Sequence, residues 1–221
     1  MHGLKRNHIN SINYLINNFP CVAILGARQV GKSTLLRQIL PDAPLIDMER
    51  ENDFLKAKED AEFLLSNFGV PLLVDEAQLC PELFKAMRVV IDKKRKLNGQ
   101  FLISGSSSPE LLKNISESLA GRVAIIELGT FSLNEIQQVP VSEFYSILQA
   151  QNWEQLLTIK PRIIGKISEV LIQGGYPDIV LKDESKFRHI WFENYFKTYI
   201  ERDVRRLFPD LQLETYRRFV R

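Results

Sequence analysis

The sequence has few cysteines, no long apolar run and almost no net charge. Among its 221 residues only Cys21 and Cys80 are cysteines, too few for a disulfide framework and compatible with a reducing cytosol. No run approaches the roughly 18 apolar residues of a membrane-spanning helix, and the N-terminus lacks an apolar signal core. The net charge of +2 favours neither nucleic acid nor membrane as a partner. The composition therefore predicts a cytoplasmic globular protein with no membrane partner.

A glycine-bounded loop follows the first apolar run. Residues 22–25 predict a buried strand, and residues 26–33 fit the pattern G-x-x-x-x-G-K-[S/T] of the phosphate-binding P-loop, or Walker A motif. Such a loop wraps backbone N–H groups around a phosphate, and glycine tolerates the backbone angles that this requires. The alternative is an ordinary Gly-rich turn between a strand and a helix. The residues predicted to bind the nucleotide are Gly26, Ala27, Arg28, Gln29, Val30, Gly31, Lys32, Ser33 and Thr34.

Two side chains after the loop add phosphate and metal chemistry. Lys32 can reach the β- and γ-phosphates, and the hydroxyl of Ser33 can ligate Mg²⁺. The helix that begins at Lys32 directs the partial positive charge of its N-terminus at the same phosphate. The sequence therefore predicts ATP and Mg²⁺ as cofactors, bound at this loop.

Two adjacent carboxylates follow another apolar run. Residues 71–74 predict a buried strand, and Asp75 and Glu76 come directly after it. Nucleotide hydrolysis needs a carboxylate near Mg²⁺ and a group that activates water. Because ligands of open parallel sheets bind at the carboxyl ends of strands, we expect this strand to neighbour the P-loop strand. Asp75 would then serve the metal and Glu76 the attacking water, unless the pair belongs to an ordinary acidic loop.

Three further polar residues are candidates for nucleotide contacts. Ser104 ends a predicted strand at residues 101–103 and can sense the γ-phosphate, or it can belong to a Ser-rich turn in which Ser108 caps the next helix. Arg122 can offset transition-state charge, often in a neighbouring subunit, or it can pair with a carboxylate. Arg28 has the same two interpretations.

Apolar runs alternate with helical patterns through the first 130 residues. Strands that are apolar throughout and separated by helices indicate a parallel sheet covered on both faces. We therefore predict a three-layer αβα fold with a parallel sheet, followed by a helical C-terminal extension. Strands are predicted at residues 21–25, 45–48, 71–74, 101–103 and 123–128, and helices at 9–19, 32–39, 53–68, from Pro81 and from Pro109.

The pattern changes after residue 130, where strand signals fade. Helical patterns occupy residues 142–149, 162–171 and 187–207, and an unfinished helical segment occupies 211–221. We predict an ATPase core at 1–130, a connecting helical segment at 131–160 and the start of a truncated second domain at 161–221. The aromatic residues near position 195 favour a packing face over a base-stacking platform. Residues 186–221 hold nine Lys or Arg against five Asp or Glu, a weak sign of a polyanionic partner.

Six short motifs together resemble the prokaryotic AAA+-type ATPases, in which an ATP-binding domain precedes an uncharacterised C-terminal domain. The motifs are GARQVGKST (26–34), LLVDEAQ (72–78), SGS (104–106), LAGR (119–122), GGYP (174–177) and IERDV (200–204). The resemblance implies an ATPase core with Lys32, Ser33, Asp75 and Glu76 at the matching positions. It also implies a second domain that begins near Ile163. Ser104 stands where such ATPases commonly have Asn or Thr.

The combined signals predict a Mg²⁺-dependent ATPase whose hydrolysis is coupled to a conformational change of the helical C-terminal part. One alternative is a non-hydrolysing switch or scaffold that nucleotide controls. A second is a small-molecule kinase, against which the Asp75–Glu76 pair and the lack of an arginine-rich lid argue. A homo-oligomer and a DNA or protein partner stay open at this point.

Overall fold

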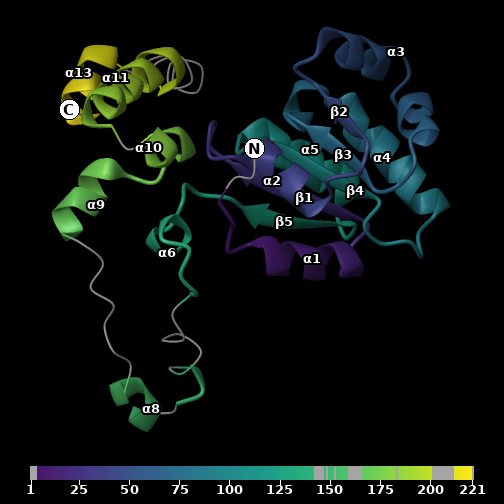
Figure 1. The fold of residues 1–221 in the computed structure, drawn as a ribbon. Helices are drawn as coiled ribbons and strands as arrows, with labels where there is room; N and C mark the ends of the chain where they lie inside the picture. The colour runs from purple at the N-terminus through teal and green to yellow at the C-terminus, as the bar shows by residue number, and fades with distance from the viewer. Residues whose placement is uncertain are drawn as a thin grey trace. The chain divides into compact units, whose positions relative to one another are not determined.

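The computed structural model of the chain describes residues 4–141, 147, 149–151, 153–158, 166–182, 184–200 and 212–220 (Figure 1). Contacts divide the chain into two compact units, residues 1–162 and 163–221. The boundaries predicted at residues 130 and 160 stay predictions. Two predicted features, the helix at 142–149 and the motif at 200–204, lie largely outside the described residues.

Five parallel strands form one sheet in the first unit, in the order β2-β3-β4-β1-β5. Their bounds are β1 (Cys21–Gly26), β2 (Leu45–Asp47), β3 (Leu72–Asp75), β4 (Phe101–Ser106) and β5 (Val123–Glu127). The predicted parallel sheet is confirmed. One expectation about it is wrong: β3, which ends in Asp75, is not the neighbour of the P-loop strand β1. Strand β4 pairs with both and separates them.

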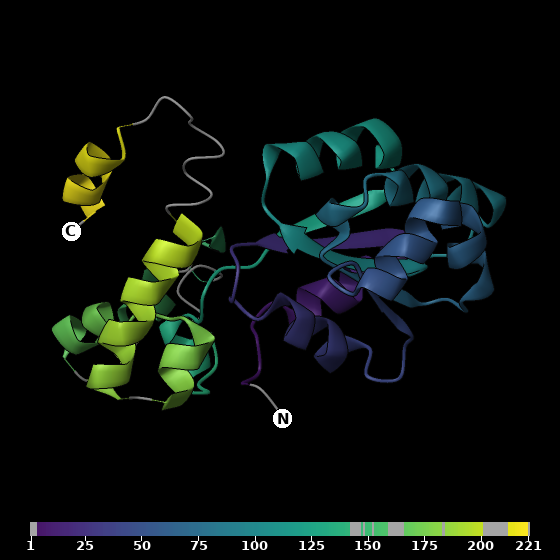
Figure 2. The ribbon, with the colours of Figure 1, turned by 90° about the horizontal axis from the view of Figure 1, so that it is seen from above.

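Helices cover both faces of this sheet. Their bounds are α1 (Ile9–Asn18), α2 (Lys32–Ile39), α3 (Glu51–Asn67), α4 (Glu82–Lys93) and α5 (Pro109–Leu119). Alternate residues of a strand point to opposite faces, and Cys21, Ala23 and Leu25 of β1 join a buried cluster with side chains of α3, α4 and α5. Figure 2 shows α1 and α2 on the other side of the sheet. The predicted three-layer αβα architecture is confirmed.

Local capping explains two helix boundaries. The hydroxyl of Ser108 accepts a hydrogen bond from the Leu111 N–H at 3.2 Å, and Pro109 begins α5, as the sequence predicts. Helix α3 is interrupted at Asp60, whose backbone is not helical (φ −153°, ψ 90°). Its carboxylate accepts a hydrogen bond from the Phe63 N–H at 2.9 Å, so Asp60 caps a new helical segment. The sequence predicted one uninterrupted helix here because helical spacing continues across Asp60.

The first unit also contains the 3₁₀ turn η1 (Ala77–Leu79), α6 (Leu133–Ile136) and α8 (Trp153–Thr158). No individual helix was predicted at these positions, although α6 and α8 lie within residues 131–160, which the sequence predicted to be a connecting helical segment. Helix α6 starts with a reciprocal capping box in which Ser132 and Glu135 each bond the backbone of the other. Such short elements bury too few side chains to show a clear apolar period in sequence.

Helices, with short turns between them, make up the second unit over its described residues. It contains α9 (Ile167–Gln173), α10 (Pro177–Lys182), α11 (Ser185–Tyr195), a π-helical turn η2 (Phe196–Ile200) and α13 (Leu213–Val220). The predicted helical C-terminal extension is therefore confirmed for these residues. Among all the residues that the structure describes, none of the helices is long and apolar enough to cross a membrane.

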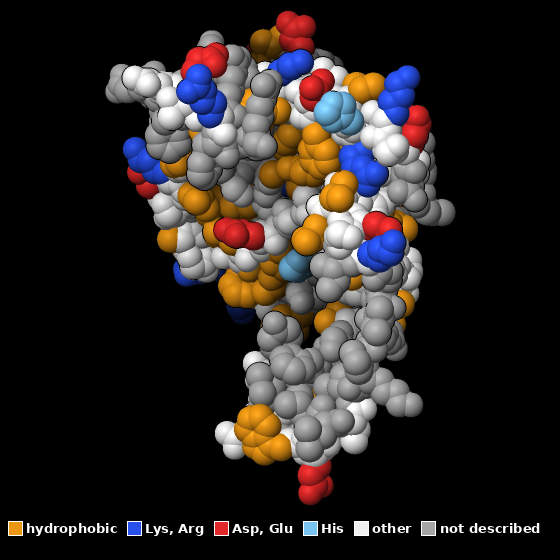
Figure 3. Space-filling view, turned by 90° about the vertical axis from the view of Figure 1, so that its left-hand side faces the viewer, with side chains coloured by type: hydrophobic (Ala, Val, Ile, Leu, Met, Phe, Trp, Pro, Cys, Tyr) orange, Lys and Arg blue, Asp and Glu red, His pale blue; other side chains and the backbone are white. Residues whose placement is uncertain are grey.

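Aromatic side chains hold α10 and α11 of this unit together. The ring of Tyr176 lies 4.9 Å from that of Trp191 and 5.0 Å from that of Tyr195, measured between centroids. Gly174 has φ 67°, and a Cβ there would lie 3.5 Å from Phe192 Cζ, so the GGYP motif turns the chain closely past this cluster. The predicted packing face is confirmed. Other apolar side chains of the unit, Leu171 among them, are exposed, and Figure 3 shows hydrophobic side chains lying at the surface among charged ones.

Candidate active site

The site lies at the carboxyl edge of the sheet, where β1, β4 and β3 end side by side. Gly26 at the end of β1 pairs in register with Ser106 of β4, and Val74 of β3 pairs with Ile103. Because β4 lies between β1 and β3, Ser104 lies between the P-loop and Asp75. The strand order thus brings together three motifs that are far apart in the sequence.

Close packing and left-handed backbone angles shape the P-loop. A Cβ at Gly26 would lie 2.3 Å from the carbonyl oxygen of Leu128, so only glycine fits at that position. Gly31 (φ 93°) precedes α2, and Gln29 is also left-handed (φ 61°) although it is not glycine. The helix begins its ladder with the bond from Leu35 N to Gly31 O. The three N–H groups before Leu35 therefore point out of the helix end, where they suit an anion.

Lys32 is a buried cation inside this loop. Its residue is only 4% exposed, and its Nζ donates to the carbonyl oxygens of Gly26 at 3.2 Å and Ala27 at 2.9 Å. Burial lowers the pKa of Lys32, and the negative charges of Glu76 and Asp75 oppose that shift. The nearby charge of Arg28 lowers the pKa further. Because the ammonium group of this lysine is shielded from water, a phosphate oxyanion placed beside it would stabilise its charged form strongly.

Asp75 is held rigidly at the end of β3. It is 6% exposed, and its Oδ1 accepts hydrogen bonds from the Glu76 N–H at 3.1 Å and from the hydroxyl of Ser104. Ser104 itself is 1% exposed. The structure therefore places the Ser104 hydroxyl on the Asp75 carboxylate, and its predicted contact with a γ-phosphate stays a prediction.

Glu76 lies between Lys32 and Gln78. Its backbone is left-handed (φ 50°, ψ 42°), which turns the chain sharply out of β3 into η1. Its Oε1 lies 4.0 Å from Lys32 Nζ, and its Oε2 accepts a hydrogen bond from Gln78. Four predicted residues thus converge at one place: Lys32, Asp75, Glu76 and Ser104.

Arg122 does not join them. It precedes β5 and so lies at the amino edge of the parallel sheet, opposite the P-loop. Its Nε and Nη2 donate to the two carboxylate oxygens of Asp92 at 2.8 and 3.0 Å, and its Nη1 donates to the Ala120 carbonyl. The ion-pair interpretation therefore holds within this chain. A role of Arg122 in the site of a neighbouring subunit stays a prediction.

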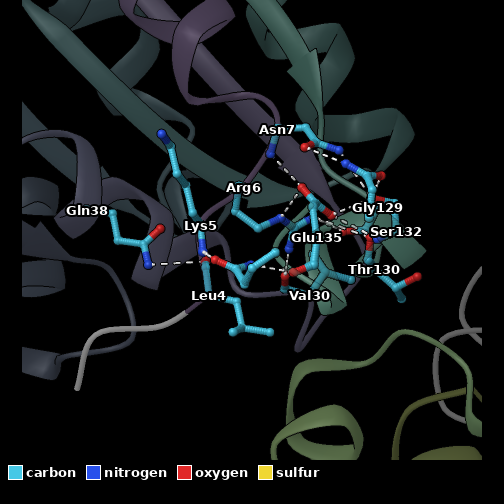
Figure 4. Close-up of polar contacts among 12 residues, drawn as sticks. Leu4, Lys5, Arg6, Asn7, Val30, Gln38, Gly129, Thr130, Ser132 and Glu135 are labelled. Carbon is cyan, nitrogen blue, oxygen red and sulfur yellow. Dashed lines mark hydrogen bonds and ion pairs between the residues drawn. The ribbon is translucent and has the colours of Figure 1, made fainter. Parts of the chain in front are cut away.

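Arg6 connects the P-loop to the chain that follows β5 through hydrogen bonds (Figure 4). The sequence did not predict this role of Arg6. Its Nη1 donates to the Val30 carbonyl at 2.9 Å, its Nη2 to the Gly129 carbonyl at 2.7 Å and its Nε to Glu135 at 3.1 Å. Arg6 and Glu135 are 5% and 4% exposed. Burial lowers the pKa of Arg6, and the Glu135 carboxylate opposes that shift. No motif could have shown this, because the two residues meet only through the fold.

Comparison with known protein families assigns most of the chain to two family models. A family model described as an AAA domain matches residues 18–137, which is more than half of the chain. The chain belongs to the AAA domain family. A second model, a domain of unknown function, matches residues 164–221.

Nearly the whole chain is also similar to proteins of known sequence and to a protein of known structure. Uncharacterized proteins of Mycobacterium bovis and Mycobacterium tuberculosis are each 27% identical over 215 residues, which cover 97% of this chain and 43% of theirs. The chain thus spans less than half the length of these relatives. A Walker-type ATPase of Pyrococcus abyssi has a similar fold, with a TM-score of 0.56 at 17% identity, covering 95% of this chain and 79% of that one. Family and fold together support a nucleotide-binding P-loop domain of the ATPase type.

The donor set of the AAA domain suits a nucleotide with Mg²⁺. The N–H groups at the N-terminus of α2 suit a phosphate, and Lys32 supplies a desolvated positive charge. Among the described residues no group of three or more His, Cys, Asp or Glu is placed to hold a metal. Mg²⁺ at nucleotide sites commonly takes one or two protein ligands and completes its shell with phosphate oxygens and water. Asp75 and Ser33 would be those ligands here.

Proposed function

We propose that this AAA domain binds ATP with Mg²⁺ and hydrolyses it to ADP and phosphate. The observation that supports the proposal is the convergence of Lys32, Asp75 and Glu76 at one edge of the sheet, with Lys32 Nζ 4.0 Å from Glu76 Oε1. A kinase would need an acceptor site, whereas a carboxylate beside the phosphate-binding lysine suits activation of water.

Each side chain has a distinct task in the proposed reaction. The N–H groups at the start of α2 and the Lys32 ammonium bind the β- and γ-phosphates, and Ser33 and Asp75 hold Mg²⁺. Bound Mg²⁺ neutralises charge on the phosphate oxygens. Glu76 orients a water molecule toward the γ-phosphorus and accepts its proton as the new P–O bond forms and the bond to ADP breaks.

Substitution of Glu76 tests this mechanism. Glu76→Gln keeps the size of the side chain but removes the base, so phosphate release should fall on the order of a hundredfold or more while ATP binding persists. Glu62→Gln is the matched control, because Glu62 of α3 forms an exposed ion pair with Lys93 of α4 and its substitution should leave turnover unchanged. Phosphate release measured with purified protein and Mg²⁺ decides the matter. A Glu76→Gln protein that turns over at the parent rate contradicts the assignment.

Substitution of Lys32 separates hydrolysis from a switch function. Lys32→Ala removes the buried cation and should abolish ATP binding as well as turnover. If the parent chain binds ATP without any turnover, and Lys32→Ala reduces only the folded content or the affinity for a partner, the non-hydrolysing switch is favoured instead.

We further propose that hydrolysis in the cytoplasm is coupled to a conformational change of the helical C-terminal segment, in a homo-oligomer that acts on DNA or on a protein partner. The basic composition of residues 186–221 and the motif resemblance support this extension. Molecular mass with and without ATP tests the oligomer, and ATPase rates with and without DNA test the partner. Binding to DNA that does not weaken with added salt would argue against contacts with the phosphate backbone.

A further inference from the structure

Gln78 connects the proposed catalytic base to the neighbouring strand. It lies on η1, two residues after Glu76, and its Nε2 donates a hydrogen bond to Glu76 Oε2. Its Oε1 accepts a hydrogen bond from the backbone N–H of Ser106, the last residue of β4, at 3.2 Å. One amide side chain thus spans the ends of two strands that carry the site.

The orientation of the Gln78 amide follows from its partners. A backbone N–H can only donate, so the amide oxygen must face Ser106. The NH₂ group must then face Glu76, whose ionised carboxylate can only accept. Both ends of the amide are matched to their neighbours, and flipping the amide would lose both hydrogen bonds.

The space for this side chain depends on the glycine that precedes Ser106. A Cβ at Gly105 would lie 2.6 Å from Gln78 Oε1 and 2.6 Å from Leu111 Cδ2. No real Cβ sits so close to other heavy atoms, so any larger residue at position 105 would push the amide out of place. The absence of a side chain at Gly105 therefore leaves the space that the Gln78 amide occupies.

The two oxygens of Glu76 have different partners, which matters once a nucleotide is bound. Oε1 faces Lys32 at 4.0 Å, and Oε2 is held by Gln78. A phosphate that draws the Lys32 ammonium toward itself weakens the first contact and leaves the second intact. Oε1 is then free to accept a water proton while Oε2 stays fixed.

We propose that Gln78 is a positioning residue that holds the Glu76 carboxylate in the orientation needed for hydrolysis and links it, through the Ser106 N–H, to the turn between β4 and α5. This inference rests on the proposed ATPase function and adds a residue to it. Gln78 acts through its hydrogen bond to Glu76, so its contribution should appear in kcat rather than in ATP affinity. A misplacement of a reacting group by about 1 Å commonly costs on the order of a hundredfold in rate.

The test compares Gln78→Met with a matched substitution at the other end of β4. Gln78→Met keeps the side-chain volume but removes both hydrogen bonds, so kcat should fall tenfold to a hundredfold (roughly, from the cost of misplacing a reacting group) with KM and ATP affinity within about twofold. Gln100→Met is the control. The side chain of Gln100 is buried and its Nε2 donates to the backbone carbonyls of Lys94 and Leu97, just before β4, so its loss should lower stability and leave kcat unchanged.

A double substitution distinguishes positioning from general support of the fold. In a Glu76→Gln background no carboxylate base remains to be oriented, so Gln78→Met should not lower the residual rate further. An equal loss in both backgrounds would show a structural role and overturn the inference. If Gln78→Met does not fold by circular dichroism, Gln78→Glu serves in its place, because it retains an acceptor for the Ser106 N–H and removes the donor to Glu76.

The outcomes separate the two proposals. A parent chain without turnover overturns the proposed function and this inference with it. An active parent whose kcat survives Gln78→Met unchanged overturns the inference alone and leaves the ATPase assignment standing.

Discussion

At the scale of single residues, the site is built from polar side chains that are buried away from water and hydrogen-bonded to other groups of the protein. Lys32 donates to two loop carbonyls, and Asp75 accepts from Ser104 and from the backbone. Buried polar groups are costly unless they are hydrogen-bonded, and these are bonded to elements that cannot easily move. Their positions are therefore set by the fold itself, which is what the proposed hydrolysis would require of its electrostatic groups.

Burial acts on the thiol of Cys21 in a way that a pH series can measure. It raises the pKa of Cys21 from 9.0 to about 12, since the thiolate would have no water in the core. In the unfolded chain the thiol ionises above about pH 9, while in the folded chain it stays neutral. The unfolded chain alone therefore gains free energy from ionisation of this thiol as the pH rises from 9 toward 12. The free energy of unfolding is thus unaffected by this group below pH 9 and falls across that interval.

We expect the free energy of unfolding of the parent to fall between pH 8 and pH 10 by about 1.4 kcal/mol more than that of Cys21→Ala. Urea unfolding followed by circular dichroism at the two pH values gives the comparison. The cavity left by the substitution weakens the variant equally at both pH values and cancels in the difference. Equal losses in the two proteins would contradict the assigned shift.

At the scale of elements, turns at the carboxyl ends of the strands determine whether the site forms. The end of β1 touches the chain just after β5, where Leu128 N bonds Leu25 O at 2.7 Å and the Leu128 carbonyl lies against Gly26. The P-loop therefore begins from a point that is fixed on its outer side by the neighbouring edge strand.

Gly26→Ala should disturb this junction. Its Cβ would meet the Leu128 carbonyl oxygen at 2.3 Å, and a backbone atom cannot turn aside as a flexible side chain can. We expect a loss of roughly 1–3 kcal/mol in unfolding free energy together with weaker ATP binding. Gly129→Ala is the control, since nothing lies within 4 Å of a Cβ there. Unfolding in urea and titration with a fluorescent ATP analogue measure both effects, and a Gly26→Ala protein as stable as the control would disprove the contact.

At the scale of the whole sheet-containing unit, the Arg6–Glu135 pair joins three distant segments. It fastens the N-terminal segment to the P-loop carbonyl of Val30 and to the chain that follows β5 (Figure 4). Burial alone would raise the pKa of Glu135, but N–H groups of Asn7 and Ser132 and the charge of Arg6 outweigh it, so the pKa lies below its usual value. The carboxylate therefore stays ionised, as the pair requires.

Arg6→Met should be strongly destabilising because it leaves the buried Glu135 carboxylate without its cation. A loss of about 3–5 kcal/mol is typical of breaking such a pair. Lys58→Met removes one partner of the exposed Lys58–Glu82 pair and should cost less than about 1 kcal/mol. Urea unfolding of the three proteins compares them. The double variant Arg6→Met with Glu135→Met should regain part of the loss, and a loss below 1 kcal/mol for Arg6→Met alone would show that the pair contributes little.

The sequence by itself determined the local features of this protein. The glycine spacing and Lys32 specify the P-loop, the apolar runs specify the strands, and Ser108 with Pro109 specifies the start of α5. Each of these depends on backbone angles, caps or side-chain alternation over a few neighbouring residues, so a single segment is enough to predict it.

Only the tertiary structure decided which of these features meet. The strand order inserts β4 between β1 and β3, which places Ser104 on Asp75 and leaves Arg122 at the opposite edge. The Gln78–Ser106 bond and the Arg6–Glu135 pair likewise join residues distant in the chain. The physical reason is that strand order and buried pairing arise from packing the whole core, and many local patterns are compatible with more than one such arrangement.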